Sequence, residues 1–178
     1  GVPASSPRLP SQQPRIPAAL WHLADAVFSQ RFETGLFQQP GDPLIVAEIL
    51  RHFDSPALHA TPLPAKLRQG TGKECAYALV KVCADLTISL VGFPWMPALT
   101  AAGKLGTFAA CNAALELLTP VSHFNVVLYL VSLFKALLRP EHATRNGLRT
   151  EGLARLAAFA FTPLGAHYRS GAMAHRLP

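Results

Sequence analysis

Apolar residues recur at helical spacing along most of the chain, and no segment has the strict alternation that is typical of a half-buried strand. The first helical stretch is IPAALWHLADAVFSQRFE. Pro17 suits a first helical turn, where a missing N–H needs no partner. The apolar positions follow i, i+4, i+7 spacing and are Ile16, Leu20, Leu23, Ala24 and Val27.

A second helix is predicted in DPLIVAEILRHFD. Asp42 is a suitable N-cap, and Pro43 occupies the first helical position. The apolar face of this helix consists of Ile45, Ile49, Leu50 and Phe53. Residues 54–71 hold three prolines and are therefore predicted to be largely loop.

Helical periodicity resumes in GKECAYALVKVCADLTISLV and is interrupted by Pro94 and Pro97. The next stretch, ALTAAGKLGTFAACNAALELL, predicts one further helix, which Gly103 and Gly106 weaken. Pro120 is expected to close this helix.

The clearest helix in the chain is PVSHFNVVLYLVSLFKALLRP, with Ser122 as the expected cap and Pro140 as its end. A polar loop is expected up to Gly147. A last helix follows in TEGLARLAAFAFTPL, where Thr150 can cap. The patterning as a whole predicts an all-α domain of about seven to nine helices.

The length of 178 residues fits a single domain with a real core. Half of the residues are hydrophobic and only 15% are charged, which agrees with packed helices. We expect residues 1–15 to form a flexible Pro/Ser-rich linker, residues 16–170 to form the domain, and residues 171–178 to form a loose C-terminal tail.

Residues 86–103 and 117–134 are uncharged and reach transmembrane length. Prolines interrupt the first stretch, and polar residues lie near the start of the second, so buried core helices explain both better. Cys75, Cys83 and Cys111 are odd in number and lack CxxC spacing. This usage indicates reduced, buried thiols in an intracellular protein. The interruptions in the two apolar stretches are the reason that no transmembrane segment is expected.

The formal net charge is +6, and eleven of the sixteen basic residues are arginines. Such a surface suits partners that carry carboxylates or phosphates. No basic run exceeds two residues, and no aromatic residues are interleaved with the basic ones as stacking platforms. Nucleic acid is therefore not an expected partner.

Candidate chemistry is sparse. The segment QGTGKEC at 69–75 imitates a phosphate loop, but Leu67 and Glu74 stand where a Walker A site needs glycine and serine or threonine. A turn at a helix start is the better interpretation.

The histidines have no metal-ligand spacing, and no nucleophile elbow is present, so neither a metal site nor a cofactor is expected. Trp21 favours core packing, with a partner-binding indole as the alternative.

Three stretches, IPAALW, LFQQPG and TPVSHFNVVLYLVSLFKALL, resemble the RhoGAP-like domain of the type II inositol polyphosphate 5-phosphatase and Lowe-syndrome phosphatase family. That family has Ile-Pro with a nearby Trp, then Leu-Phe-Gln-(Gln or Thr)-Pro-Gly. Its later long helix is matched here by His123, Asn125, Val126, Tyr129 and Leu130. The similarity spans roughly residues 16–165, and it implies a catalytic phosphatase domain upstream.

The resemblance indicates a role for TGLFQQPGD at residues 34–42, the glutamine loop, which contains Gln38 and Gln39. Active RhoGAP domains carry Gly-Ile-Phe-Arg-x-x-Gly here, and Gln38 stands where the arginine would be. The family's lysine falls nearest Val80, with Lys81 one position away. Its Leu-Pro-Glu-Pro run is replaced by residues 86–89, and its Phe-Gly-Pro-Asn run by residues 161–164. Arg31 or Arg51 could substitute in space for the missing arginine, although a solvated surface role is favoured for both.

The resemblance therefore implies a catalytically inactive domain that binds small GTPases of Rho or Rab type, short amphipathic helices of endocytic adaptors, or both. The residues expected to bind partners are Gln38, Gln39, Lys81 and Trp21. A cytoplasmic protein recruited to endosomal or Golgi membranes is expected. Two alternatives remain open: an active GTPase-activating domain with a non-standard arginine, and a helical scaffold that shares only the fold.

Overall fold

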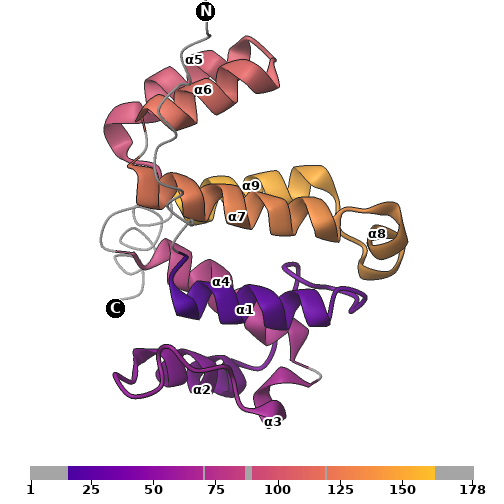
Figure 1. Cartoon of the computed structure of the whole chain (residues 1–178). Coiled ribbons are helices and arrows are strands. Elements are labelled where there is room, and N and C mark those ends of the chain that lie inside the picture. The colour runs from indigo at the N-terminus through magenta and orange to yellow at the C-terminus, as the bar shows by residue number, and fades with distance from the viewer. Residues whose placement is uncertain (1–15, 70, 87–89, 119, 163–178) are drawn as a thin grey trace, which may run out of the picture.

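A computed structural model describes residues 16–69, 71–86, 90–118 and 120–162, and all regular secondary structure within them is helical. The expected 1–15 linker and 171–178 tail lie outside these residues. These described residues contain nine α-helices and one short 3-10 helix, η1 (Figure 1). Their bounds are α1 Ala18–Ser29, α2 Pro43–Asp54, α3 Ala65–Arg68, α4 Gly72–Ala84, η1 Phe93–Trp95, α5 Met96–Lys104, α6 Phe108–Leu118, α7 Val121–Leu137, α8 Pro140–Asn146 and α9 Thr150–Phe161.

α4 is the central helix of the domain, because it packs against α1, α2 and α9. Figure 1 shows α1 and α4 in the middle, α2 and α3 on one side of them, and α7 and α9 on the other. α5 and α6 pair with each other and stand at the far end beyond α7.

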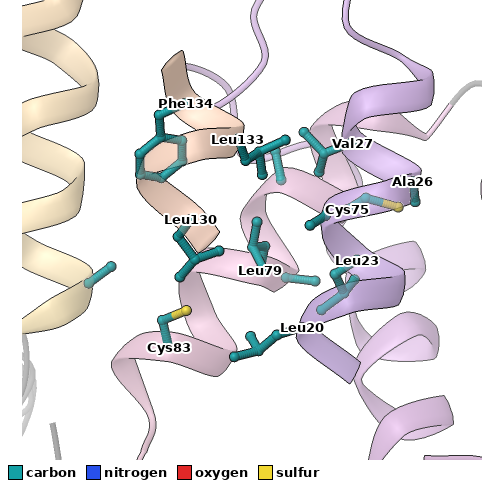
Figure 2. Packing of buried hydrophobic residues seen from close by; sticks show 14 of the residues in the cluster. Leu20, Leu23, Ala26, Val27, Cys75, Leu79, Cys83, Leu130, Leu133 and Phe134 are labelled. Atoms are coloured by element: carbon teal, nitrogen blue, oxygen red, sulfur yellow. The ribbon is translucent and has the colours of Figure 1, made fainter. Parts of the chain in front are cut away.

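The core forms where α1, α4 and α7 face one another. Each helix contributes a buried apolar face at 3.6-residue spacing, which removes these side chains from water. Figure 2 shows this convergence. The buried residues at its centre are Leu20, Leu23 and Val27 of α1, Leu79 and Cys83 of α4, and Leu130, Leu133 and Phe134 of α7.

The predicted start of the second helix is confirmed. Asp42 is the N-cap of α2, and its carboxylate accepts a hydrogen bond from the Leu44 N–H at 2.8 Å. Pro43 is the first helical residue, as its fixed φ and missing N–H favour. The predicted helix-start turn before Lys73 is also confirmed, because α4 begins at Gly72.

The prediction that residues 54–71 are largely loop is confirmed for the described residues, with the four-residue helix α3 inside them. Two other element predictions are wrong. The single helix expected across residues 98–118 is two helices, α5 and α6, because Gly106 adopts a positive φ of 68° between them. The polar loop expected before Gly147 is the helix α8, which has Pro140 at its first position.

Two predicted caps are also wrong. Ser122 lies inside α7, whose N-cap is Pro120, and Thr150 is the first residue of α9, whose N-cap is Arg149. Neither helix has a side-chain cap hydrogen bond. Helical periodicity located these helices correctly, but the N-cap of each lies one or two residues before the residue that was expected to cap it.

Within the part of the chain that the structure describes, no single helix is both long and apolar enough to cross a membrane. α7 and α8 are long and apolar enough only when taken together, and the two helices are bent by 78° relative to each other.

Candidate functional site

The glutamine loop between α1 and α2 has a tightly turned backbone. Gly35 has a φ of 86°, which a residue with a side chain rarely adopts, and Phe37 has a φ of 58°. The carbonyl of Gly35 accepts hydrogen bonds from the N–H groups of Gln38 at 3.0 Å and Gln39 at 3.1 Å. This turn fixes Gln38 and Gln39 next to each other at the surface.

The buried side-chain amide of Asn146, the last residue of α8, holds one side of the loop in place. The Asn146 side chain is fully buried and donates to the carbonyls of Arg31 at 2.9 Å and Leu137 at 3.2 Å. Its oxygen accepts from the Leu148 N–H at 2.9 Å. The Gly35 N–H donates to the Asn146 carbonyl at 3.3 Å. One side chain therefore joins the glutamine loop, α7 and the α8–α9 corner.

The other side of the loop is tied to the start of α4. The Gly72 N–H donates to the Glu33 carboxylate at 3.0 Å, and the Asp42 N–H donates to the Glu74 carboxylate at 2.9 Å. Lys73 Nζ donates to Gln39 Oε1 at 2.8 Å. A protein carboxylate thus occupies the helix start in QGTGKEC, which agrees with a turn and not with a phosphate loop.

Gln38 is exposed, and its amide donates to the Gly147 carbonyl at 2.9 Å. Two open pockets meet at this residue. The larger has a volume of about 760 Å³ and is lined by Phe37, Gln38, the α8–α9 corner and the start of α9. The smaller, of about 250 Å³, lies between the loop, α4 and α9.

The two pockets differ in character. Arg149 and Arg155 line the larger pocket, together with one acidic residue, Glu151. The smaller pocket is mainly apolar and is bordered by two exposed aromatic residues, Tyr77 of α4 and Phe159 of α9. Together they offer a charged recess and an apolar recess on either side of Gln38.

Two of the four residues expected to bind partners, Gln38 and Gln39, lie at these pockets. Lys81 lies further along α4 and forms a 2.8 Å ion pair with Asp85. Trp21 lines neither pocket, and the expectation that it packs in the core is wrong, because it is 48% exposed. Its neighbours on the sequence, Leu20 and Leu23, take the buried face of α1.

The arginines considered as substitutes, Arg31 and Arg51, line neither pocket. The Arg31 guanidinium lies over the rings of Phe28 and Phe32, with its carbon 5.1 and 4.7 Å from their centroids. Arg51 is an exposed residue of α2. The positions of Arg31 and Arg51 both agree with the surface role that was favoured for them.

Sequence reasoning missed Asn146, Arg149 and Arg155. They lie more than a hundred positions from Gln38 in the chain. One signal was available, because an asparagine-glycine pair before a helical stretch is a strong turn signal. Gly147 does adopt a positive φ of 74° at the end of α8.

The buried thiols do not add a nucleophile to the site. Burial raises the pKa of Cys75 to about 11 and that of Cys83 to about 12, so both remain neutral near pH 7. Among the residues that the structure describes, no three His, Cys, Asp or Glu side chains are grouped to hold a metal ion.

No family model matches the chain, and no curated protein sequence matches it. Solved structures do. The crystal structure of the BH domain from GRAF, the GTPase regulator associated with focal adhesion kinase, matches with a TM-score of 0.64. The match covers 81% of this chain and 79% of that domain at 14% sequence identity.

The chain has a RhoGAP-like fold. The expected all-α, RhoGAP-like architecture is therefore confirmed. At this sequence identity the likeness shows the fold alone, and it does not support the narrower relationship to the 5-phosphatase family.

Proposed function

We propose that this chain is a small-GTPase-binding domain that docks its partner on the surface around Gln38 and does not supply an arginine finger. The observation that carries the proposal is the neutral Gln38 amide at the tip of the loop, hydrogen bonded to the chain's own Gly147 carbonyl. The RhoGAP-like fold and the two pockets beside this residue support docking there.

Loss of an arginine finger has a large kinetic cost. The guanidinium stabilises charge on the transferring phosphoryl group and accelerates hydrolysis by about 10³- to 10⁵-fold. At about 1.4 kcal/mol per decade, its absence removes roughly 4 to 7 kcal/mol of transition-state stabilisation. A neutral amide cannot replace that charge. Binding uses a wider surface than one side chain, so it can persist without catalysis.

The smaller pocket supports the binding half of the proposal. Its exposed aromatic residues, Tyr77 and Phe159, border a recess that can receive one apolar side chain of a partner. Arg149 and Arg155 give the larger pocket positive charge that suits an acidic partner surface. Small GTPases of Rho or Rab type are the proposed partners.

A second candidate function is an active GTPase-activating domain that uses an arginine from α9. It is favoured by one observation: Arg149 and Arg155 line the same pocket as Gln38. A guanidinium from this helix would approach the nucleotide from a different direction than the loop residue.

Single-turnover GTP hydrolysis with Rac-, Cdc42- and Rab-type proteins distinguishes the two functions. We expect the wild-type chain to bind the GTP-loaded protein in a pull-down and to accelerate hydrolysis less than about tenfold. Gln38→Arg should raise the rate at least about tenfold, a fraction of a full finger's effect. Gln38→Lys, which adds charge without the guanidinium fork, is the matched control.

Acceleration of a hundredfold or more by the wild-type chain would contradict inactivity. If Arg149→Ala or Arg155→Ala then abolished it, the second function would replace the first. A folded chain that binds none of the GTPases would leave only a helical scaffold.

The wider setting is also proposed: a C-terminal part of an inositol polyphosphate 5-phosphatase that binds amphipathic helices of endocytic adaptors in the cytoplasm and at endosomal or Golgi membranes. The sequence resemblance supports it, and the exposed Trp21 indole offers an anchor for such a helix. Phosphatase motifs in the upstream reading frame would test the setting. Adaptor-peptide binding that Trp21→Ala abolishes would test the anchor.

A further inference from the structure

A second concave surface lies between α7 and α9. This groove has a volume of about 710 Å³ and is lined by both helices. α9 turns Thr150, Ala154 and Ala157 toward it, whereas Arg155 and Phe159 border the pockets beside Gln38. At 100° per residue these two sets point to opposite faces of α9, while the buried Leu153 lines both the groove and the larger pocket, so the groove adjoins the proposed GTPase surface at that residue.

The floor of the groove is apolar. Phe134 and Leu153 form part of it, and Ala154 and Ala157 leave room for a close approach to the α9 backbone. On the α7 side, Val131 is 44% exposed and borders the groove. An apolar face that continues from a helix surface into a groove is typical of an interaction site.

The rim of the groove is basic. Lys135 and Arg139 both line it, and both are exposed. Lys135 lies in the last turn of α7, and Arg139 is the N-cap of α8, two residues after α7 ends. Among the residues that the structure describes, the ion pairs use Lys66, Arg68 and Lys81. Neither Lys135 nor Arg139 pairs with a described carboxylate.

We propose that the α7–α9 groove binds an amphipathic helix of a partner protein that has an apolar stripe flanked by acidic residues. From Val131 to Leu137, where α7 ends, the groove follows this helix for about 9 Å, which is nearly two turns and suits a bound helix with anchors at i, i+3 or i+4, and i+7. The apolar floor receives the stripe, and the basic rim selects the acidic flank.

Charge argues against the chain's own ends as the occupant. Residues 1–15 and 163–178 contain four arginines and no acidic residue, the same sign as the rim. The inference does not depend on GTPase binding, because the exposed residues of α9 that line the groove point away from Arg155 and Phe159, and only the buried Leu153 is shared.

The probe for a test is a fluorescein-labelled, helix-stapled peptide of about 16 residues with leucines at i, i+3, i+4 and i+7 and glutamates beside them. Fluorescence anisotropy with the full chain should show saturable binding. Ala154→Trp fills the groove at an exposed position, and Lys135→Glu with Arg139→Glu reverses the rim charge. Each change should weaken binding at least about tenfold. Circular dichroism establishes that the variants remain folded.

Two controls make the result specific. Arg155→Glu, which reverses a charge on the opposite face of α9, should leave peptide affinity within about twofold. The rim-reversed variant should bind a peptide with lysines in place of the glutamates at least about tenfold better than the wild-type chain does.

The proposal is overturned if the folded full chain does not bind the acidic peptide, or if Ala154→Trp and the rim reversal leave its affinity unchanged. It is also overturned if binding requires removal of residues 163–178, because that segment would then be the occupant.

Discussion

At the residue scale, Gln38 and Asn146 show two uses of the same amide group. Gln38 is exposed, and its amide closes one hydrogen bond to Gly147. Asn146 is fully buried and holds three backbone groups from separate parts of the chain. Since buried polar groups lose water as an alternative partner, the second amide contributes far more to stability than the first.

Asn146→Ala should therefore lower the free energy of unfolding by about 3 kcal/mol, because it leaves the Arg31 and Leu137 carbonyls and the Leu148 N–H without this partner. Urea denaturation monitored by circular dichroism measures this change. Gln38→Ala is the matched control and should cost less than about 1 kcal/mol. Equal losses in the two variants would contradict the central role given to Asn146.

At the element scale, helix starts with a strong chemical signal were predicted well. Aspartate followed by proline both accepts a hydrogen bond from the first turn and fixes φ, so α2 could be placed from local sequence. α8 could not, because its seven residues include no large apolar side chain and its position depends on the contacts of the buried His142 and Asn146 with α1 and α7. A short helix of this kind is stabilised by tertiary contacts and not by its own propensity.

The α2 cap gives a prediction at this scale. Asp42→Ala should lower the free energy of unfolding by about 1 kcal/mol, because the Leu44 N–H loses its acceptor. Asp42→Asn keeps a side-chain acceptor and should recover most of that loss. Asp54→Ala, at the other end of α2, should change stability by less than about 0.5 kcal/mol. Thermal denaturation of the four proteins compares them, and a larger loss for Asp54→Ala would contradict the assignment.

At the scale of the whole molecule, the core contains two thiols that resist ionisation. Burial is the main cause of the raised pKa of Cys75 and Cys83, and burial also raises the pKa of Tyr129. All three groups are neutral when protonated, so the folded state disfavours loss of their protons.

The stability of the fold should consequently fall at alkaline pH. Below about pH 8 the thiols are protonated in both states, and their raised pKa values cost nothing. Above about pH 9 the unfolded thiols ionise, while the folded ones keep their protons up to about 11 and 12. The unfolding free energy contributed by these groups therefore decreases from about pH 9 and levels off above pH 12.

Urea denaturation at pH 8 and pH 10.5 under reducing conditions measures this loss. Cys75→Ala with Cys83→Ala removes both groups, so the double variant should lose less stability than the wild type between the two pH values. The comparison within each protein cancels the cost of the cavities that the substitutions create. An undiminished pH dependence in the double variant would assign the effect to other groups.

The sequence by itself determined the all-helical class, the central helices and the identity of the residue at the tip of the glutamine loop. These follow from periodicity and from the chemistry of single side chains, which act over one or two turns.

Only the tertiary structure decided what surrounds that loop. Arg149 and Arg155 reach the Gln38 pocket, and Asn146 fixes the loop, because α8 and α9 return to α1 after more than a hundred residues. The same packing leaves Trp21 exposed and creates the α7–α9 groove. Local patterns say which face of a helix is apolar, but the crossing of helices that are distant in the chain decides which faces meet and which remain open.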